Sequence, residues 1–358
     1  MTITRNFIFY NKSDTLPEQP VIFVDGSDHL IFRQGYDFEL SHWVPNYTPL
    51  ELKADTSTGI CLKFLDSKYN LNQSLLLNNH LDSDGVLSAF TLIHPALARK
   101  NAATIKSASR MGDFGAGGCE KALELWTGLV NEIHKTNHQC NQEAYLKGIE
   151  LVRLILEGKQ PYSEDFEEAI QCLERSKRWI DDGELERNQI SKRFTHFHLP
   201  KALCQRNGAL LPYFEPNFDV GVEKNHLLPR QVRNQLDEQK VQLISVEESK
   251  GYSYDLLIPQ YMWAETPDSW RFPGFICMES SNRYELVHPE LEQATRKLMD
   301  LEINPGSWVM AKNMSPFQSV KGRGFPVILS FLKDSKIAPS SIPPNEVSAI
   351  IGEALEKP

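Results

Sequence analysis

Short apolar runs that stop at polar clusters mark the predicted strands in the first half of the chain. Residues 75–77 are three leucines followed by Asn78, and residues 21–24 are an apolar run followed by Asp25. Such short, uninterrupted runs are typical of strands that are buried on both faces of a sheet. Residues 86–97 are then apolar enough for a buried helix. The pattern therefore predicts an α/β arrangement in this half.

The rest of the chain is predicted to be helical up to about residue 193 and mixed after it. Apolar residues recur every three or four positions in residues 120–133 and 145–155, which indicates amphipathic helices. Residues 102–105 are typical of a brief strand that leads into a loop at Asp113. Residues 163–193 are strongly charged, as in a solvent-facing helix. Later strands are expected at residues 194–199, 241–246, 255–258, 308–311 and 325–331, and a further helix at residues 288–301.

These elements predict two domains. A chain of 358 residues is too long for one typical hydrophobic core. We expect an α/β domain over residues 1–192, with a largely parallel sheet flanked by helices and a helical linker at its end. A second, smaller α+β domain is expected over residues 193–358. The cleft between the two domains is the expected place for a functional site.

Composition and charge narrow the function classes. Hydrophobic residues make up 41% and charged residues 24% of the chain, which is ordinary for a soluble globular protein. The net charge of -9 argues against a general nucleic-acid or membrane-surface binder, although a nucleotide-sized ligand stays possible. The six scattered cysteines are expected to be reduced thiols. With neither a signal peptide nor a bilayer-spanning apolar run in the sequence, a cytoplasmic location is expected. The oligomeric state is not predicted.

The strongest candidate chemistry directly follows the three leucines. His80, Asp82 and Asp84 stand at alternate positions. In an extended chain alternate side chains project to the same side, so an imidazole and two carboxylates would converge on one cation. The carboxyl end of a strand is also where open α/β sheets usually place their active sites. If residues 21–24 form a strand parallel to residues 75–77, Asp25 would face the same crevice.

Each of these residues also has a simpler interpretation. Asp84 would cap a helix that begins near residue 86, and Asp82 would stabilise the turn before it. His80 would be a core histidine that is hydrogen-bonded, and Asp25 would belong to an Asp-Gly turn. For any one residue alone the simpler interpretation is favoured, whereas the three at alternating spacing favour a metal site.

Further candidate residues are scattered over both halves. His42, next to Trp43, is a candidate acid or base, although packing is the commoner role of such a histidine. Glycines at positions 115, 117 and 118 precede a helix, where free backbone N–H groups would bind phosphate or simply form a turn. His196 and His198 are expected on the exposed, polar side of their strand. The cationic residues expected to reach an anionic substrate are Arg283, Lys321 and Arg323.

A resemblance to a known superfamily is carried by two of these segments. The run His80-Leu81-Asp82-Ser83-Asp84-Gly85 resembles the first motif of the DHH phosphoesterase superfamily, and Met111-Gly112-Asp113-Phe114 is similar to its second motif, an aspartate that follows a strand. The resemblance covers roughly residues 20–130. Residues 40–43 and 54–58 look closer still to an uncharacterised bacterial family that is related to this superfamily.

The resemblance implies a Mn²⁺- or Mg²⁺-dependent hydrolase of phosphodiesters, pyrophosphates or polyphosphates. It implies that His80, Asp82, Asp84 and Asp113 hold metal and that Asp25 completes the set. His80, Asp84 and His42 would then be catalytic, and the substrate would be a small phosphorylated or nucleotide-like compound that Asn79, Gly115, Gly117, Gly118 and the cationic residues contact. The defining Asp-His-His tripeptide is absent from the sequence. The alternative is therefore an inactive module that binds a nucleotide or a protein.

Overall fold

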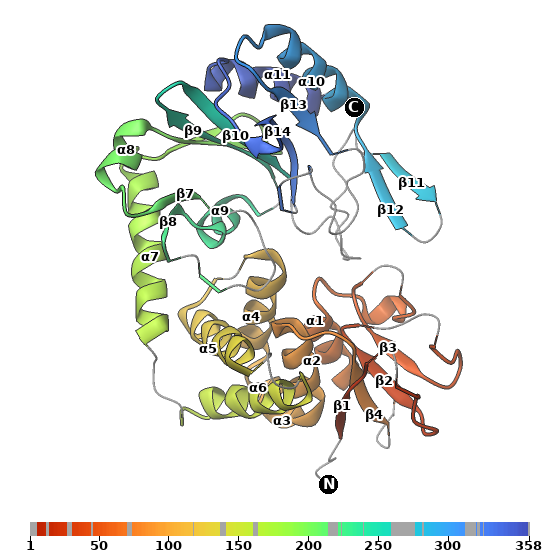
Figure 1. The fold of residues 1–358 in the computed structure, drawn as a ribbon. Helices are drawn as coiled ribbons and strands as arrows, with labels where there is room; N and C mark the ends of the chain where they lie inside the picture. Colours follow the sequence, from red (N-terminus) through yellow and green to blue (C-terminus); the bar gives the residue numbers. More distant parts are fainter. Residues whose placement is uncertain are drawn as a thin grey trace. The chain divides into compact units, whose positions relative to one another are not determined.

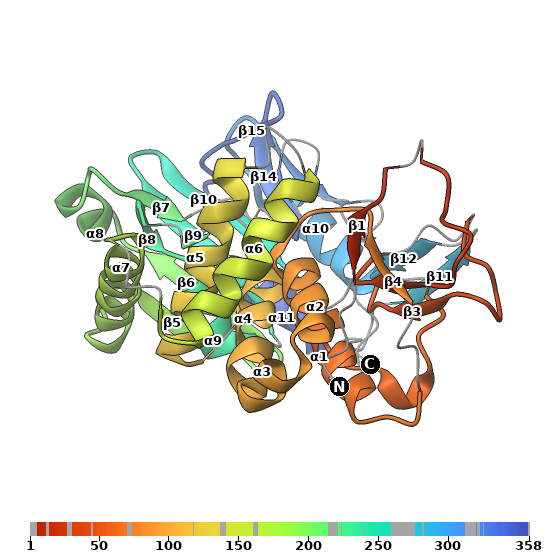
Figure 2. The ribbon, with the colours of Figure 1, turned by 90° about the horizontal axis from the view of Figure 1, so that it is seen from below.

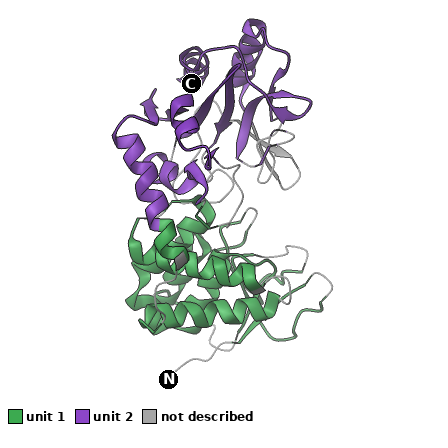
Figure 3. Cartoon of the chain, turned by 60° about the vertical axis from the view of Figure 1, so that its left-hand side comes forward, with its two compact units in different colours: residues 1–169, 218–222, 264–269 green, residues 170–217, 223–263, 270–358 purple. Residues whose placement is uncertain are grey.

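The computed structural model describes most of the chain as two compact units, each built from its own elements (Figure 3). The first consists mainly of residues 1–169 and the second mainly of residues 170–358. This division falls within helix α7 (Glu164–Asp181), earlier than the predicted boundary at residue 192. The described residues are 6–11, 14–26, 31–43, 46–69, 74–116, 118–136, 141–159, 164–213, 221–222, 224–238, 240–258, 276–280, 283–311, 320, 323–324 and 326–356, of which 136, 164, 276–280 and 283–286 are described by their backbone only.

The first unit contains a four-stranded, wholly parallel sheet with the strand order β1-β4-β2-β3. The predicted parallel α/β sheet is therefore confirmed. The two apolar runs are its central strands, β2 and β4, and every residue of both is buried. Because all four strands run the same way, their carboxyl ends meet at one edge of the sheet. The strands are β1 (Phe7–Phe9), β2 (Val21–Val24), β3 (Phe38–Leu40) and β4 (Leu75–Asn78).

Helices and connecting segments cover this sheet. Side chains of β2 and β4 pack on one face with Leu16, Ile31 and Phe32 of the connecting segments. Helix α2 contacts β2, α1 contacts β3 and α6 contacts β1, while α4, α5 and α6 all pack against α2 (Figure 1 and Figure 2). The helices are the 3-10 helix η1 (Leu50–Leu52), α1 (Ser57–Leu65), α2 (Ser83–Ile93), α3 (Pro95–Lys100), α4 (Ala102–Phe114), α5 (Glu120–Thr136) and α6 (Asn141–Leu156).

Two helices differ from the sequence prediction. Residues 102–105 were predicted as a strand but begin helix α4, so Asp113 lies near the end of a helix and does not follow a strand. Among the buried residues of α4, those at positions 105, 108, 109 and 113 have the spacing of a single helical face, and the last turn of the helix is buried all round. The helix predicted over residues 86–97 begins earlier, at Ser83, and stops before Pro95, whose ring cannot continue it.

The second unit, where the sequence predicted an α+β domain, is built around a sheet of seven strands. Its order is β13-β14-β10-β9-β6-β5 with β15 beside β14, and every pair is antiparallel except β6 with β9. The predicted strands at residues 194–199 and 241–246 and the helix at residues 288–301 are confirmed. Whether the two units are separate domains stays a prediction.

The elements of the second unit have the following bounds. The sheet strands are β5 (Glu186–Gln189), β6 (Phe194–Leu199), β9 (Val241–Glu248), β10 (Gly251–Leu257), β13 (Ser307–Met310), β14 (Val327–Lys333) and β15 (Lys336–Ile337). Two short pairs are β7 (Leu211–Tyr213) with β8 (His226–Leu228) and β11 (Ile276–Ser280) with β12 (Arg283–Val287). The helices besides α7 are α8 (Lys201–Arg206), α9 (Arg230–Asp237), α10 (Pro289–Leu301) and α11 (Pro344–Glu356).

Among the described residues, no helix combines the length and the apolar character that a membrane span requires. The four cysteines whose side chains are described, Cys61, Cys119, Cys172 and Cys204, are reduced, outside any disulfide bond.

The histidines of β6 lie inside the second unit and share one hydroxyl group. The Nε2 atom of His196 is 2.7 Å and the Nδ1 atom of His198 is 2.8 Å from the Ser245 hydroxyl oxygen. The expectation of an exposed side was wrong for His196, of which only 3% is exposed, whereas His198 is half-buried. Burial, with a smaller contribution from His198, lowers the pKa of His196 to about 4.

Acidification is therefore expected to destabilise the second unit. The unfolded chain binds a proton at His196 more readily than the folded chain does, so stability falls as the pH drops from about 6.5 towards 4. The full loss is about 3 kcal/mol for this group. Urea unfolding at neutral pH and near pH 5 would measure the loss, and His196→Gln should reduce the pH dependence while the exposed His134→Gln should not. Equal pH dependence in all three proteins would contradict this assignment.

Candidate metal centre

The carboxyl ends of three neighbouring strands bring polar side chains to one edge of the parallel sheet. Asp25 directly follows β2, His42 lies just beyond β3 and His80 just beyond β4. Strands β2 and β4 are apolar and buried, and polar residues begin where each of them ends. This edge is where α/β sheets place their ligands.

Asp25, His80 and Asp82 form the first ligand set. The Nε2 atom of His80 is 2.9 Å from Oδ2 of Asp25 and 3.2 Å from Oδ2 of Asp82. These Asp25 and His80 atoms are both buried. One ligand atom from each of the three residues lies within 4.8 Å of the others, so the set could hold a metal ion.

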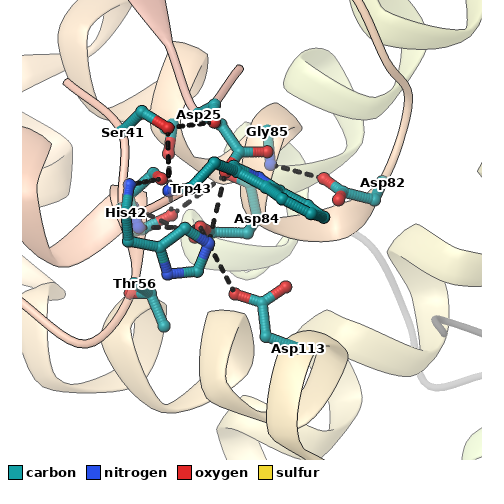
Figure 4. A network of polar contacts seen from close by, with 12 residues as sticks. Asp25, Ser41, His42, Trp43, Thr56, Asp82, Asp84, Gly85 and Asp113 are labelled. Atoms are coloured by element: carbon teal, nitrogen blue, oxygen red, sulfur yellow. Dashed lines mark hydrogen bonds and ion pairs between the residues drawn. The ribbon is translucent and has the colours of Figure 1, made fainter. Parts of the chain in front are cut away.

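Asp25, His42 and Asp84 form the second ligand set, beside which Asp113 lies (Figure 4). The Nε2 atom of His42 is 3.6 Å from Oδ1 of Asp25 and 3.8 Å from Oδ2 of Asp84. It is also 3.7 Å from Oδ2 of Asp113, which is brought here from α4. Atoms that bind one cation at about 2.1 Å lie roughly 3.0–3.5 Å apart, which is close to these separations.

The hydrogen bond on the other side of the His42 ring determines which ring nitrogen carries the proton. Its Nδ1 atom is 2.6 Å from the carbonyl oxygen of Asp55. A carbonyl only accepts, so Nδ1 carries the proton and Nε2 presents a lone pair towards the carboxylates. Burial lowers the pKa of His42, which favours this neutral form. Arg110 holds the Asp55 side chain at 2.7 Å. The geometry thus allows His42 to act as a metal ligand, and the acid or base role that the sequence suggested stays a prediction.

The starts of two helices position the paired aspartates. Asp82 is the N-cap of α2 and accepts from the Gly85 N–H at 2.8 Å. Asp84, fully buried, accepts from the N–H groups of Ser57 (2.8 Å) and Thr58 (3.0 Å) at the start of α1. These N–H groups have no partner within a helix, so carboxylates satisfy them well.

The predicted extended geometry of this segment was therefore wrong. Strand β4 ends at Asn78, and Asp84 already lies in the first turn of α2. The capping role that the sequence suggested for Asp84 belongs to Asp82, because the helix begins earlier than the apolar pattern indicated.

The electrostatics of the cluster favour a cation. Burial and the neighbouring Asp25 raise the pKa of Asp84 well above its usual value. Burial opposes the charged form of His80, but Asp82 and Asp25 outweigh it and raise the His80 pKa well above its usual value. Several carboxylates with little access to water need a compensating positive charge. Oxygen ligands with a minority of imidazoles suit Mn²⁺ or Mg²⁺ better than zinc, so the residues present could hold such an ion, whose identity stays a prediction.

The glycine-rich segment has a structural role at two of its positions. Gly115 ends α4 in the left-handed conformation, at φ 62°. The N–H group of Gly118 donates to the hydroxyl of Ser107 at 3.1 Å. Gly117 lies outside the described residues. Phosphate binding by these glycines stays a prediction, as does substrate contact by Asn79, whose side-chain oxygen is 3.3 Å from Nδ1 of His80.

The cationic candidates of the second unit are only partly described. Arg283 is paired with Ser280 in a β-hairpin, but its side chain is not described, and Lys321 lies outside the described residues. The Arg323 side chain is 7% exposed and forms an ion pair with the buried Asp255, with Nε 3.0 Å from Oδ1. A buried carboxylate needs such a partner, so Arg323 has a structural role here, and its contact with a substrate stays a prediction.

Sequence reasoning missed one residue that contacts the first ligand set. The hydroxyl of Tyr145, on α6, donates to the carbonyl oxygen of His80 at 2.9 Å. The apolar periodicity of α6 indicated only that Tyr145 is buried. A contact with a residue so distant in the sequence depends on how α6 packs against α2, which no local pattern encodes.

Comparisons with known proteins identify a family and nothing more specific. Neither the curated proteins nor the solved structures gave a match. A model described as a family of unknown function, DUF6687, matches residues 4–357. Since this match spans nearly the whole sequence, the chain belongs to the DUF6687 family.

Proposed function

We propose that this protein is a Mn²⁺- or Mg²⁺-dependent hydrolase of phosphate esters or anhydrides. The observation that carries the proposal is the position of Asp25, whose Oδ2 faces His80 while its Oδ1 faces His42. A carboxylate shared between two cations about 3.5–4 Å apart is a recurrent arrangement in phosphatases and nucleases. The resemblance of the segment around His80 to the DHH phosphoesterases supports the same reaction class.

The residues would divide between two cations as the two ligand sets do. His80 and Asp82 would hold the first and His42 and Asp84 the second, with Asp25 shared and Asp113 beside the second. Such ions, when bound, polarise a phosphoryl oxygen and make water more acidic.

Exposure distinguishes the two sets. The side chains of His80 and Asp82 are 33% and 21% exposed, whereas those of His42 and Asp84 are fully buried. We therefore expect the substrate to approach from the side of the first set, where the side chains of two ligands are partly exposed to solvent. The second set, enclosed by the start of α1 and the end of α4, would hold its ion more rigidly.

Turnover by the purified protein tests this proposal. With MnCl₂, we expect hydrolysis of at least one of bis(p-nitrophenyl) phosphate, pyrophosphate, a short oligonucleotide or a cyclic dinucleotide, and no hydrolysis with EDTA. Asp84→Asn should lower the rate by about 100-fold or more, because it weakens a metal ligand. Asp37→Asn removes another buried carboxylate, one that pairs with Arg33, and should retain turnover. If Mn²⁺ binds but no substrate is hydrolysed, the chain is instead a metal-dependent binding module.

A further inference from the structure

The backbone of His80 is held from outside the metal centre by a hydroxyl group. Tyr145, fully buried on α6, donates from its hydroxyl to the His80 carbonyl oxygen at 2.9 Å. The same hydroxyl accepts from the side-chain N–H of Asn78 at 2.6 Å. The rings of Phe7 and Phe9 pack on the Tyr145 ring, with centroids 4.3 and 5.9 Å away. The position of the hydroxyl is therefore fixed by packing.

Asn78 also forms hydrogen bonds with the turn that follows β4. Its side-chain oxygen accepts from the N–H groups of Asn79 at 2.6 Å and of His80 at 3.2 Å. Side chains thus satisfy both backbone polar groups of His80, although this residue lies outside any helix or strand. Since the imidazole itself is one-third exposed, its orientation depends on how firmly this backbone is held.

The second ligand set is held by other groups. The His42 ring is oriented by the carbonyl of Asp55, and Asp84 is held by the start of α1. The hydrogen bonds of Tyr145 reach His80 and Asn78, which belong to the first set and to the turn that carries it. A change at the Tyr145 hydroxyl should therefore act on one set and leave the other as it is.

We propose that Tyr145 is the positioning residue of the first cation site: it orients His80 towards Asp25 and Asp82. This inference rests on the proposed metal centre, but it concerns the selective affinity of one site. Residues that hold a metal ligand in place typically contribute a factor of about 10–100 to metal affinity.

A titration with MnCl₂ tests the inference. Calorimetry and electron paramagnetic resonance of the bound ion monitor the binding. The unaltered protein should bind two ions. Tyr145→Phe should weaken one of them by about 10- to 100-fold and leave the other unchanged. Tyr254→Phe is the matched control, since Tyr254 is also buried and its hydroxyl also donates to a backbone carbonyl, that of Ile342 at 2.6 Å, within the second unit. This control should bind both ions normally.

The outcomes separate this inference from the hydrolase proposal. If Tyr145→Phe binds both ions normally, or weakens both equally, the positioning role is overturned. If one ion is weakened but the unaltered protein hydrolyses none of the phosphate compounds, the positioning role stands and the hydrolase proposal fails. If the unaltered protein binds no Mn²⁺, both fail. Should Tyr145→Phe not fold, Asn78→Ala can take its place. It removes the hydrogen bonds from Asn78 to the same turn and should lower the affinity for the same ion.

Discussion

Replacing Asp25 by asparagine is expected to abolish the stabilisation that Mn²⁺ gives to this protein. Asp25 belongs to both ligand sets, so its loss should affect both ions. A ligand present at about 1,000 times its dissociation constant stabilises the folded state by about 4 kcal/mol per site. Urea unfolding with and without MnCl₂ should show this gain in the unaltered protein and almost none in Asp25→Asn.

The backbone of Asp25 makes asparagine the right replacement. Asp25 adopts a left-handed conformation, at φ 69°, which most residues avoid and which asparagine tolerates. Asp25→Asn therefore removes the negative charge without adding backbone strain, whereas Asp25→Ala would combine both effects. A strained, buried carboxylate at the end of a strand is also what a functional site commonly retains.

A second aspartate serves as the control for this experiment. Asp37 is buried, accepts from the N–H of Val21 at 3.2 Å and pairs with Arg33 at 2.7 Å. Asp37→Asn should lower the stability of the metal-free protein but keep the full gain on adding Mn²⁺. If Asp25→Asn kept that gain, or if the unaltered protein had none, the cluster would be structural and not a metal site.

The sequence predicted the part of the site that follows from strand ends. Two uninterrupted apolar runs implied parallel, buried strands, and parallel strands place their carboxyl ends together. This argument alone predicts that Asp25 and His80 lie close together. In the structure, Oδ2 of Asp25 is 2.9 Å from Nε2 of His80. His42 was a weaker candidate because a histidine beside a tryptophan more often has a packing role.

The remainder of the site depends on packing that no local pattern records. Asp113 reaches His42 from a helix that the sequence suggested would begin as a strand, because the short run at residues 102–105 has too few positions to distinguish the two periods. The tautomer of His42 is set by a backbone carbonyl, which every residue has and no sequence reveals. Tyr145 is placed beside His80 by the packing of α6 against α2.

Replacing Gly85 by alanine is expected to damage the first ligand set and to destabilise the first unit. A Cβ atom at this position would lie 2.2 Å from the Tyr145 hydroxyl oxygen and 2.5 Å from the Asn78 side-chain nitrogen. Alanine is normally better than glycine in a helix by about 1 kcal/mol. Overpacking of a buried site costs about 1–3 kcal/mol. The Tyr145 hydroxyl and the Asn78 side-chain nitrogen are hydrogen-bonded to each other and cannot easily move away, so the clash should outweigh the gain in helix propensity.

Thermal unfolding and MnCl₂ titration would measure both effects. Gly208→Ala is the control, because a Cβ atom there would meet only the carbonyl oxygen of Gln205, at an ordinary 3.5 Å. It should leave stability and Mn²⁺ affinity almost unchanged. A Gly85→Ala protein that is more stable than the unaltered one, with normal Mn²⁺ binding, would show that the turn after β4 is free to move.

Combining Gly85→Ala with Tyr145→Phe should identify the clash itself. The shortest contact of the new methyl group is with the Tyr145 hydroxyl oxygen, which phenylalanine lacks. The double variant is therefore expected to be less destabilised than the sum of the two single changes, by about 0.5–3 kcal/mol, as neighbouring residues in contact usually are. First-site Mn²⁺ affinity should nevertheless stay low, because the hydrogen bond that holds the His80 carbonyl is still missing. Recovery of stability without recovery of metal binding would separate packing from ligand positioning at this turn; strictly additive losses would argue that Gly85 is needed for another reason.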